Sequence, residues 1–336
     1  MTTYKLSHNM LTRAMRVLLT LMSIVVALPA MGQSDAVLSQ YYEMPAYYNP
    51  GAIGTTDFLQ IRAGGRMQWV GIDHAPTTFL GGANMPVKFL SKRLGVGLLM
   101  QQESIGLYSN LSVGAQLAYK LKLFKGELSV GVQLGFVDEK FKGSKVELPD
   151  DDDYHTSGDD AIPTSDVNGN AFDLGIGAFY THRLFWAGVS VTHATSPTIT
   201  MNAESGQGAQ EHNYEFQIGR NVYFMAGSNI PIKNTLFELM PSVLYRTDFQ
   251  FWTVEATARA RYAKFLTFGV GYRYNDAVVA TVAAEYKGFF VGYSYDYPIS
   301  TISKISSGSH EILAGYSLKL DLGEKNKNKH KSIRIM

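Results

Sequence analysis

Residues 59–69 read Leu-Gln-Ile-Arg-Ala-Gly-Gly-Arg-Met-Gln-Trp, and their large apolar side chains fall on alternate positions. Leu59, Ile61 and Met67 lie on one side of this alternation, and Arg62 and Arg66 lie on the other. Successive side chains of a β-strand point to opposite faces of the sheet. The stretch therefore predicts a strand with one face in an apolar medium and the other in a polar, charged one.

The same period of two recurs from about residue 58 to residue 322, where helical periodicity is hard to find. We count about 14 such strands, among them residues 107–123, 126–137, 214–229, 250–263, 265–275 and 309–322. A soluble β-sandwich also alternates, but soluble strands average nearer five or six residues, whereas these run to about ten or more. Aromatic residues at the strand ends are typical of the interfacial girdles of membrane barrels.

The predicted connections on one side of the sheet are longer than those on the other side. A soluble β-sandwich gives no reason for such a difference. The long ones all lie on one side of the sheet: residues 138–169, 195–213 and 298–308. Those on the other side are short: residues 124–126, 181–183, 262–264 and 287–288. Outer-membrane barrels combine short periplasmic turns with long outer loops. We therefore predict an all-β fold, a transmembrane antiparallel β-barrel of about 14 strands (12–16) over residues 57–322.

The first 32 residues have the pattern of a secretory signal peptide. Lys5, Arg13 and Arg16 give a basic start, an apolar run follows over residues 17–28, and small residues end the segment at Gly32. The run is short for a membrane-spanning helix, which needs about 20 residues. We expect cleavage after Gly32 and delivery to the outer membrane of a Gram-negative bacterium.

Two flanking segments complete the predicted organisation. Residues 33–56 form a pre-strand segment, periplasmic or lumenal, and residues 323–336 form a basic periplasmic tail. The tail is a candidate for docking a periplasmic partner, and a solvated tail fits its composition equally well.

The composition excludes several classes of function. The chain has 336 residues, a formal net charge of +1 and no cysteine. Near neutrality argues against a nucleic-acid partner, and the lack of cysteine excludes disulfides, thiolate metal sites and cysteine nucleophiles. No catalytic triad, phosphate-binding loop or dinucleotide motif is present in the sequence. We predict that the protein is not an enzyme and holds no cofactor.

An acidic run, Asp150–Asp153, lies in the longest predicted loop. Clustered carboxylates suit a hard cation such as Ca²⁺, but the spacing does not match the EF-hand pattern. We interpret the run as a solvated surface loop and the scattered histidines as structural or surface residues, and we predict no metal site.

Polar and charged residues at inward-facing positions of the strands mark the predicted lumen. Such side chains are tolerated there, whereas Arg or Lys facing lipid at mid-membrane costs about 2–4 kcal/mol. They form either a structural ladder that fills the lumen or a lining that holds a plug, a solute or a peptide. The predicted lumen-lining residues are Arg62, Arg66, Gln68, Glu255, Arg259, Arg261, Arg273 and Glu285.

The segment before the first strand, residues 38–54, reads Leu-Ser-Gln-Tyr-Tyr-Glu-Met-Pro-Ala-Tyr-Tyr-Asn-Pro-Gly-Ala-Ile-Gly. It resembles the amino-terminal signature of the PorP/SprF family, with Leu38 in place of the usual Phe and Gly51 where Ala is common. Further matches are residues 66–69, 75–78 and 241–244, so the resemblance covers the mature chain in order. The family-motif residues, also the predicted plug, are Gln40, Tyr41, Tyr42, Pro45, Asn49 and Pro50.

The resemblance implies an outer-membrane component of the type IX secretion system, and of gliding motility in species that glide. Such a protein is expected to receive, help export or anchor a secreted, adhesin-like surface protein through that protein's C-terminal sorting domain. Its expected partners are this secreted protein, other secretion components including periplasmic ones, and the lipid bilayer with its lipopolysaccharide. A solute or hydrophobic-compound channel with a similar barrel is the alternative. We also expect residues 40–50 to fold back into the barrel mouth and to stack their aromatic rings against its glycine-rich wall.

Overall fold

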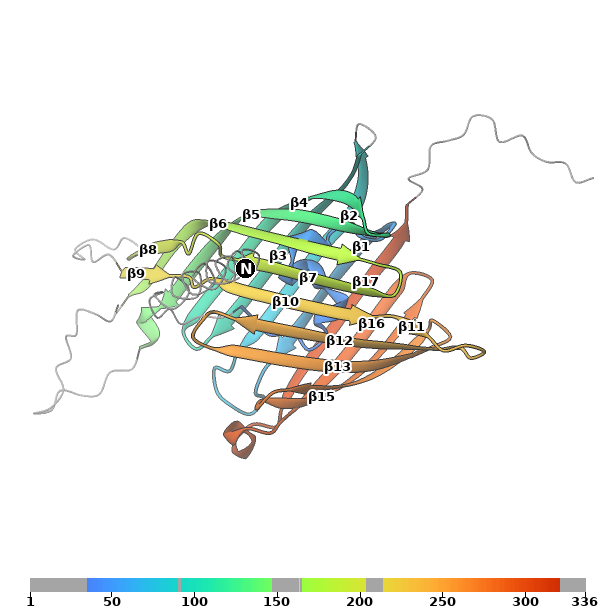
Figure 1. The fold of residues 1–336 in the computed structure, drawn as a ribbon. Helices are drawn as coiled ribbons and strands as arrows, with labels where there is room; N and C mark the ends of the chain where they lie inside the picture. The colour runs from blue at the N-terminus through green and yellow to red at the C-terminus, as the bar shows by residue number, and fades with distance from the viewer. Residues whose placement is uncertain (1–34, 90–91, 147–162, 164, 204–213, 321–336) are drawn as a thin grey trace, which may run out of the picture.

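Fourteen antiparallel strands form a closed barrel in the computed structural model, which describes residues 35–89, 92–146, 163, 165–203 and 214–320. Each wall strand pairs with its neighbours, and β1 pairs with β17 from Phe58↔Lys319 to Met67↔His310, which closes the sheet (Figure 1). The predicted fold class is confirmed. The wall strands are β1 (Phe58–Met67), β2 (Thr77–Phe89), β3 (Lys92–Ile105), β4 (Tyr108–Leu123), β5 (Gly126–Lys142), β6 (Asp166–Thr181), β7 (Phe185–Thr192), β10 (Asn221–Ser228), β12 (Phe237–Thr247), β13 (Trp252–Tyr262), β14 (Leu266–Arg273), β15 (Ala277–Tyr286), β16 (Phe289–Pro298) and β17 (Ser309–Lys319).

Shorter elements lie at the ends of the wall and inside it. Strand β8 (Thr198–Ala203) pairs with β9 (Tyr214–Gln217) and with the start of β6, and β11 (Ile230–Pro231) pairs with β12. The remaining elements are single helical turns: η1 (Tyr41–Glu43), α2 (Pro45–Tyr48), η2 (Pro50–Ala52), η3 (Gly143–Lys145) and η4 (Thr301–Lys304). Across the described ranges, no helix has the length and apolar character needed to span a membrane.

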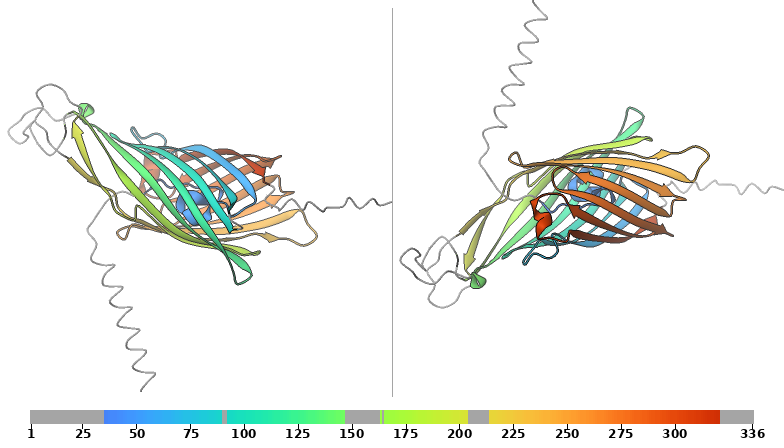
Figure 2. Two further views of the ribbon diagram at one scale, coloured as in Figure 1. Left: turned by 90° about the horizontal axis from the view of Figure 1, so that it is seen from above. Right: turned by 90° about the horizontal axis from the view of Figure 1, so that it is seen from below.

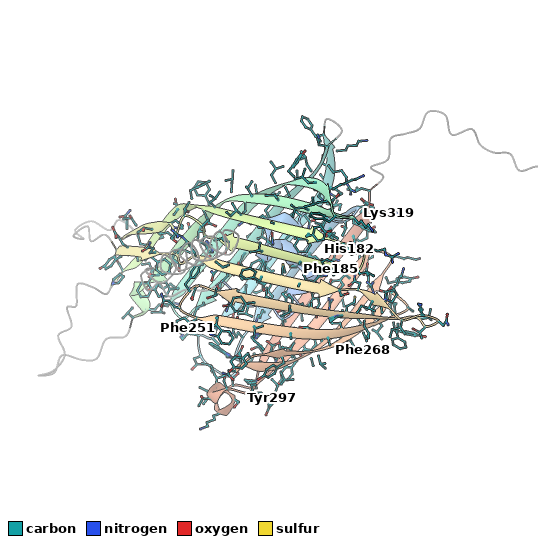
Figure 3. The ribbon with its side chains drawn as sticks, in the orientation of Figure 1. His182, Phe185, Phe251, Phe268, Tyr297 and Lys319 are labelled. Carbon is teal, nitrogen blue, oxygen red and sulfur yellow. The ribbon has the colours of Figure 1, made fainter. Side chains whose placement is uncertain are left out.

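The wall is polar inside and apolar outside, the reverse of a soluble protein. In β5, Gln133 and Glu139 are buried, whereas Val132, Leu134 and Phe136, on the opposite face, are 40–60% exposed. Figure 3 shows such outward side chains standing off the wall. A sheet with this distribution is stable only with its outer face in lipid, because exposed apolar patches of this extent are unfavourable in water.

The connections follow the predicted asymmetry with one exception. The end of the barrel that carries residues 143–165, 193–220 and 299–308 has the longer connections, and we take it as the outer end. At the other end, residues 229–236 form a longer periplasmic connection that contains β11. The single strand expected over residues 214–229 is divided into β9 and β10, because β9 pairs with β8 instead of joining the wall.

Residues 35–57, which we call the inner segment, run through the lumen from the outer end to the start of β1. Figure 2 shows this blue segment enclosed by the strands. It belongs to the main buried cluster through Leu38, Tyr41 and Tyr48, of which none is more than 1% exposed. The chain thus fills much of its own barrel.

Glycines in the wall allow the inner segment to pack very close to the strands. A Cβ added at Gly131 would collide with the carbonyl of Pro50, and one at Gly95 would collide with Ile53. The backbone therefore makes these closest approaches. The tyrosine rings contact one another and the wall's Tyr223 instead, with Tyr48 and Tyr223 centroids 5.2 Å apart.

Gly131→Ala is expected to destabilise the barrel by about 1–3 kcal/mol, the usual cost of overpacking, because its methyl group would overlap the Pro50 carbonyl. Gly81→Ala is the matched control, since the nearest atom to its added Cβ is 3.8 Å away. Denaturant unfolding of both proteins in detergent micelles measures the difference. Equal stability of the two variants would show that the inner segment is not packed against this wall.

Candidate functional site

A buried network of charges joins the inner segment to the wall. The backbone N–H groups of Ser39 and Gln40 donate hydrogen bonds to the Glu311 carboxylate at 2.7 and 2.9 Å. Arg66 forms ion pairs with Asp296 at 2.8 Å and with Glu311 at 3.3 Å. All three charged side chains are at most 2% exposed.

Ser39 lies at the centre of this network. Its hydroxyl donates to Asp296 at 2.7 Å and accepts hydrogen bonds from Arg66 at 3.0 Å and Arg273 at 2.8 Å. Arg273 also pairs with Asp296 at 3.0 Å and Glu255 at 2.7 Å. Strands β1, β14, β16 and β17 therefore meet at one residue of the inner segment, and β13 joins them through the pair between Glu255 and Arg273.

A second attachment lies further along the inner segment. The Arg259 guanidinium stacks over the Tyr42 ring at 3.4 Å from its centroid and pairs with Glu43 at 3.2 Å. The Tyr41 hydroxyl donates to Ser242 at 2.9 Å. Arg259 thus contacts the inner segment through a ring face and a carboxylate, two interactions that a neutral side chain of similar size cannot replace.

Asn49 attaches the third part of the inner segment. Its side-chain amide donates to the carbonyls of Ala178 at 3.0 Å and Val189 at 3.2 Å, and its oxygen accepts from the Gly51 N–H at 2.8 Å. An asparagine can make both kinds of bond at once, because its amide carries donors and an acceptor.

The structure brings most of the predicted lumen residues to the inner segment or its surroundings. Arg62, Arg66, Glu255, Arg259 and Arg273 are buried. Arg261 instead pairs with Glu238 near the periplasmic end. Gln68 follows the end of β1, and Glu285 is partly exposed near the end of β15. Of the motif residues, Gln40, Tyr41, Asn49 and Pro50 are buried and Tyr42 and Pro45 are half-buried.

Sequence reasoning missed several residues that complete these contacts or form the histidine cluster described below. Asp296 and Glu311 occupy inward positions of β16 and β17, so the alternation that identified the other charges contained the signal for them. Three others lie outside the regular strands, where no periodicity identifies them: Asp35, Ser39 and His193.

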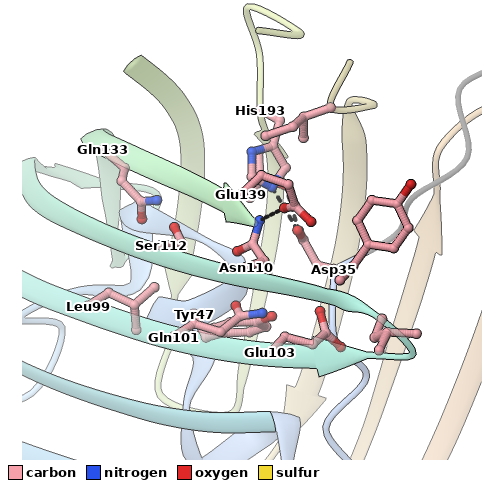
Figure 4. Close-up of a pocket in the computed structure, with 14 residues that line it drawn as sticks. Asp35, Tyr47, Leu99, Gln101, Glu103, Asn110, Ser112, Gln133, Glu139 and His193 are labelled. Atoms are coloured by element: carbon pink, nitrogen blue, oxygen red, sulfur yellow. Dashed lines mark hydrogen bonds and ion pairs between the residues drawn. The ribbon is translucent and has the colours of Figure 1, made fainter. Parts of the chain in front are cut away.

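The outer end of the inner segment is held by a carboxylate–histidine cluster. His193 Nε2 lies 2.7 Å from Asp35 and its Nδ1 lies 3.1 Å from Asp173. Asp35 also accepts hydrogen bonds from Tyr223 at 2.6 Å and Thr192 at 2.9 Å. Figure 4 shows Asp35 and His193 together at this end of the lumen.

This cluster changes the proton affinities of its members. Burial disfavours the imidazolium, but the carboxylates of Asp35 and Asp173 outweigh burial and raise the pKa of His193 to about 10. Burial alone would raise the pKa of Asp35, yet His193 and the hydrogen bonds from His193, Tyr223 and Thr192 hold it well below its usual range. The pair is therefore ionised at neutral pH.

A small cavity of about 60 Å³ lies beside this cluster. Its lining comes from the inner segment, from β3, β4 and β5, and from the connection after β7. Among the residues that the structure describes, no group of three His, Cys, Asp or Glu side chains is placed to hold a metal ion. The acidic run at residues 150–153, considered above for Ca²⁺, lies outside the described residues.

Arg66→Met is expected to lower the free energy of unfolding by about 3–5 kcal/mol, because it leaves Asp296 and Glu311 with fewer cationic partners in a buried site. Arg93→Met is the control, since its ion pair with Asp57 is solvent-exposed and such pairs contribute about 0–1 kcal/mol. Denaturant titration of both purified barrels tests this. Similar losses would mean that the buried network does not stabilise the fold.

The His193 cluster predicts a loss of stability at alkaline pH. The pKa of about 10 in the folded protein exceeds the ordinary histidine value of 6.5, so the stabilisation is complete below about pH 6.5 and disappears as pH rises through about 10. The unfolding temperature should fall more steeply between pH 7 and 10 in the wild type than in His193→Gln. His182→Gln, at the other end of β7, should keep the wild-type slope. Identical slopes in all three proteins would contradict the assignment.

Solved structures of other proteins resemble this barrel at low sequence identity. A search of curated protein sequences finds no match to the chain. Among solved structures, a Pseudomonas aeruginosa FadL homologue aligns with a TM-score of 0.49 and 10% identity over 82% of this chain and 94% of that one. The Pseudomonas putida toluene transporter TodX aligns with a TM-score of 0.46 and 11% identity over 87% and 96%. The Acinetobacter baumannii outer-membrane protein Omp33 aligns with a TM-score of 0.42 and 7% identity over 78% and 99%.

One family model matches most of the sequence. It describes the type IX secretion system membrane protein PorP/SprF and matches residues 30–316, which include the whole inner segment and nearly all of the wall. A closed barrel with an apolar outer face is consistent with that description. The chain belongs to the PorP/SprF family of type IX secretion system membrane proteins.

Proposed function

We propose that this outer-membrane barrel receives a secreted, adhesin-like surface protein and helps to export or anchor it. Recognition occurs through the C-terminal sorting domain of that protein, at the cell surface. The chain performs this role without catalysis, as one component of the type IX machinery, and contributes to gliding in species that glide. Removal of residues 1–32 precedes its insertion into the membrane.

One observation carries the proposal: the lumen holds the chain's own inner segment, attached by the buried network around Ser39. Arg66, Arg273 and Glu311 all contact this segment or its hydrogen-bonded partners. A lumen filled in this way is poorly suited to free diffusion of solutes. It supports a role in which the outer mouth binds a protein.

The periplasmic side offers a second contact in the proposal. Short turns such as residues 124–125 and 287–288 face the periplasm, and the basic tail at residues 323–336 follows β17 on that side. The tail itself lies outside the described residues. We propose that it contacts periplasmic components of the same machinery by charge attraction.

A channel for a solute or a hydrophobic compound is the competing function. A cavity of about 270 Å³ between the inner segment and the wall, lined in part by Tyr42, Arg62 and Asn84, is the observation that favours it. Conductance distinguishes the two functions, because a channel must open a continuous path and a docking barrel need not.

Planar-bilayer recording and co-purification from outer membranes test the proposal together. The wild-type barrel should conduct little and should retain a secreted protein that carries a sorting domain. The full-length variant Arg66→Met/Arg273→Met should conduct more and retain less of that protein, because the inner segment loses both of its arginine contacts at Ser39. Arg93→Met, which affects an exposed ion pair, is the control.

A chain without residues 35–56 gives a second variant for the same measurements. Free conductance of the wild type, with no secreted protein bound, would support the channel and contradict the proposal. Unchanged barrel stability and unchanged secretion after the deletion would show that the inner segment has no part in the proposed function.

A further inference from the structure

The small cavity at the outer end contains two carboxylates that the described contacts do not neutralise. Glu139 is fully buried, and its Oε2 accepts a hydrogen bond from Asn110 at 2.7 Å. Its Oε1 is shielded from solvent and has no hydrogen-bond partner within the described ranges. Glu103, across the cavity on β3, is approached by the Thr78 hydroxyl at 3.4 Å. Figure 4 shows both carboxylates with Asp35 around one space.

These two residues differ from the other carboxylates of the lumen described above. Glu255, Asp296 and Glu311 each pair with an arginine, and Asp35 and Asp173 share the charge of His193. Glu103 and Glu139 form no ion pair with a described residue. An ionised carboxylate without a positive partner is unfavourable in such a site, so a cation that enters the cavity gains two acceptors that no described cation already occupies.

The local charge balance supports the same conclusion. Around the cavity, four carboxylates (Asp35, Asp173, Glu103 and Glu139) face two cations, His193 and Arg246. Both cations are already engaged: His193 lies between two aspartates, and Arg246 donates to the Asp35 carbonyl at 2.5 Å. Glu103 and Glu139 are thus the two carboxyl groups of this set that have no described cationic partner.

The cavity's lining selects the kind of cation. Within the described part of the chain the placement of ligating side chains does not suit a metal ion. The single unpartnered oxygen of Glu139 suits an ammonium, a point charge with three N–H donors, better than a planar guanidinium, whose fork matches both oxygens of one carboxylate. Apolar atoms of Leu99, Ile105 and Ile218 line other parts of the cavity, where the methylene groups of a lysine side chain can pack.

The position of the cavity indicates where such a group comes from. Ile218, which lines it, directly follows β9, and the Phe216 ring of β9 lies 5.9 Å from that of Tyr108, another lining residue. The β8–β9 hairpin thus borders the cavity at the outer end of the barrel, the side that faces the cell surface.

Resting on the proposed function, we infer that this cavity binds the ammonium group of a lysine side chain on the exported protein. Glu139 Oε1 and Glu103 accept hydrogen bonds from the ammonium and balance its charge. The site gives the barrel a preference for an exported segment that presents a lysine to the outer mouth.

Binding of a small probe tests the site directly. The full-length barrel in detergent micelles is titrated with N-acetyl-lysine-N-methylamide and, as the neutral probe, N-acetyl-norleucine-N-methylamide, and ligand NMR measures the dissociation constants. The lysine probe should bind at least about tenfold more tightly than the neutral one, as expected for a charge-assisted hydrogen bond to a buried carboxylate.

Two isosteric Glu→Gln variants distinguish binding of the lysine probe in the cavity from its attraction to the charge of the barrel surface. Glu139→Gln should weaken lysine-probe binding at least about tenfold, while Glu215→Gln, which removes an exposed carboxylate from β9 on the same side, should change it less than twofold. Equal binding of the two probes, or equal effects of the two variants, would overturn the inference.

The proposed removal of residues 1–32 would create an α-amino group two residues before Asp35 in the sequence, and this group is another source of a primary ammonium. Reaction with an amine-reactive reagent distinguishes it: protection of the α-amino group in the wild type but not in Glu139→Gln, without probe binding, would assign the cavity to the chain itself and overturn the assignment to the exported protein.

Retention of the secreted protein in cells separates this inference from the proposed function. Glu139→Gln should lower retention if both hold. If the lysine probe fails to bind while the secreted protein still co-purifies with the wild type, the inference fails and the proposed function stands. If the probe binds but no secreted protein is retained, the ammonium site stands and the proposed function fails.

Discussion

The pairing of β1 with β17 is the constraint on which the rest of the structure depends. A membrane offers no water to unpaired backbone groups, so a sheet that crosses it must close on itself. Ten residue pairs, from Phe58↔Lys319 to Met67↔His310, form that closure. Closure creates a lumen shielded from lipid, and in that lumen polar residues can be buried. Arg66 and Glu311 are placed beside Ser39 by the alternation of β1 and β17, the strands that form the seam, and Arg273 and Asp296 by the alternation of β14 and β16.

The buried charged groups are arranged differently around Ser39 and at the outer end of the lumen. Around Ser39, arginines and carboxylates satisfy one another, and the inner segment contributes backbone N–H groups and one hydroxyl. At the outer end, His193 and Arg246 lie near four carboxyl groups, so carboxyl groups outnumber cations there. Fully paired charges fix a structure in one arrangement, whereas unpaired ones attract a ligand. The charged groups of the lumen are therefore paired around Ser39 and only partly paired at the outer end.

Much of this architecture could be predicted from residues in strands, and much less from residues outside them. A period of two identified the wall, its strand number and the inward arginines, because lipid on one side imposes the alternation. The extension of β5 to Lys142 and the division between β9 and β10 could not be read in this way, since pairing partners rather than local pattern decide where strands end. Asp35, Ser39 and His193 could not be predicted for the same reason. Ser39 contacts Glu311, and Asp35 contacts His193, and each of these contacts joins residues more than 150 positions apart in the sequence.

The glycine contacts of the wall imply an order of assembly. Gly95, Gly131 and Gly177 lie on strands β3, β5 and β6, and each allows the inner segment to approach so closely that a methyl group would not fit. A segment seated this tightly and continuous with β1 cannot easily be threaded through a finished cylinder. We infer that the nascent sheet curls around the inner segment while the β1–β17 seam is still open. The amino-terminal motif then acts as a template that sets the curvature of the barrel during folding. In the finished protein the same segment fills the lumen.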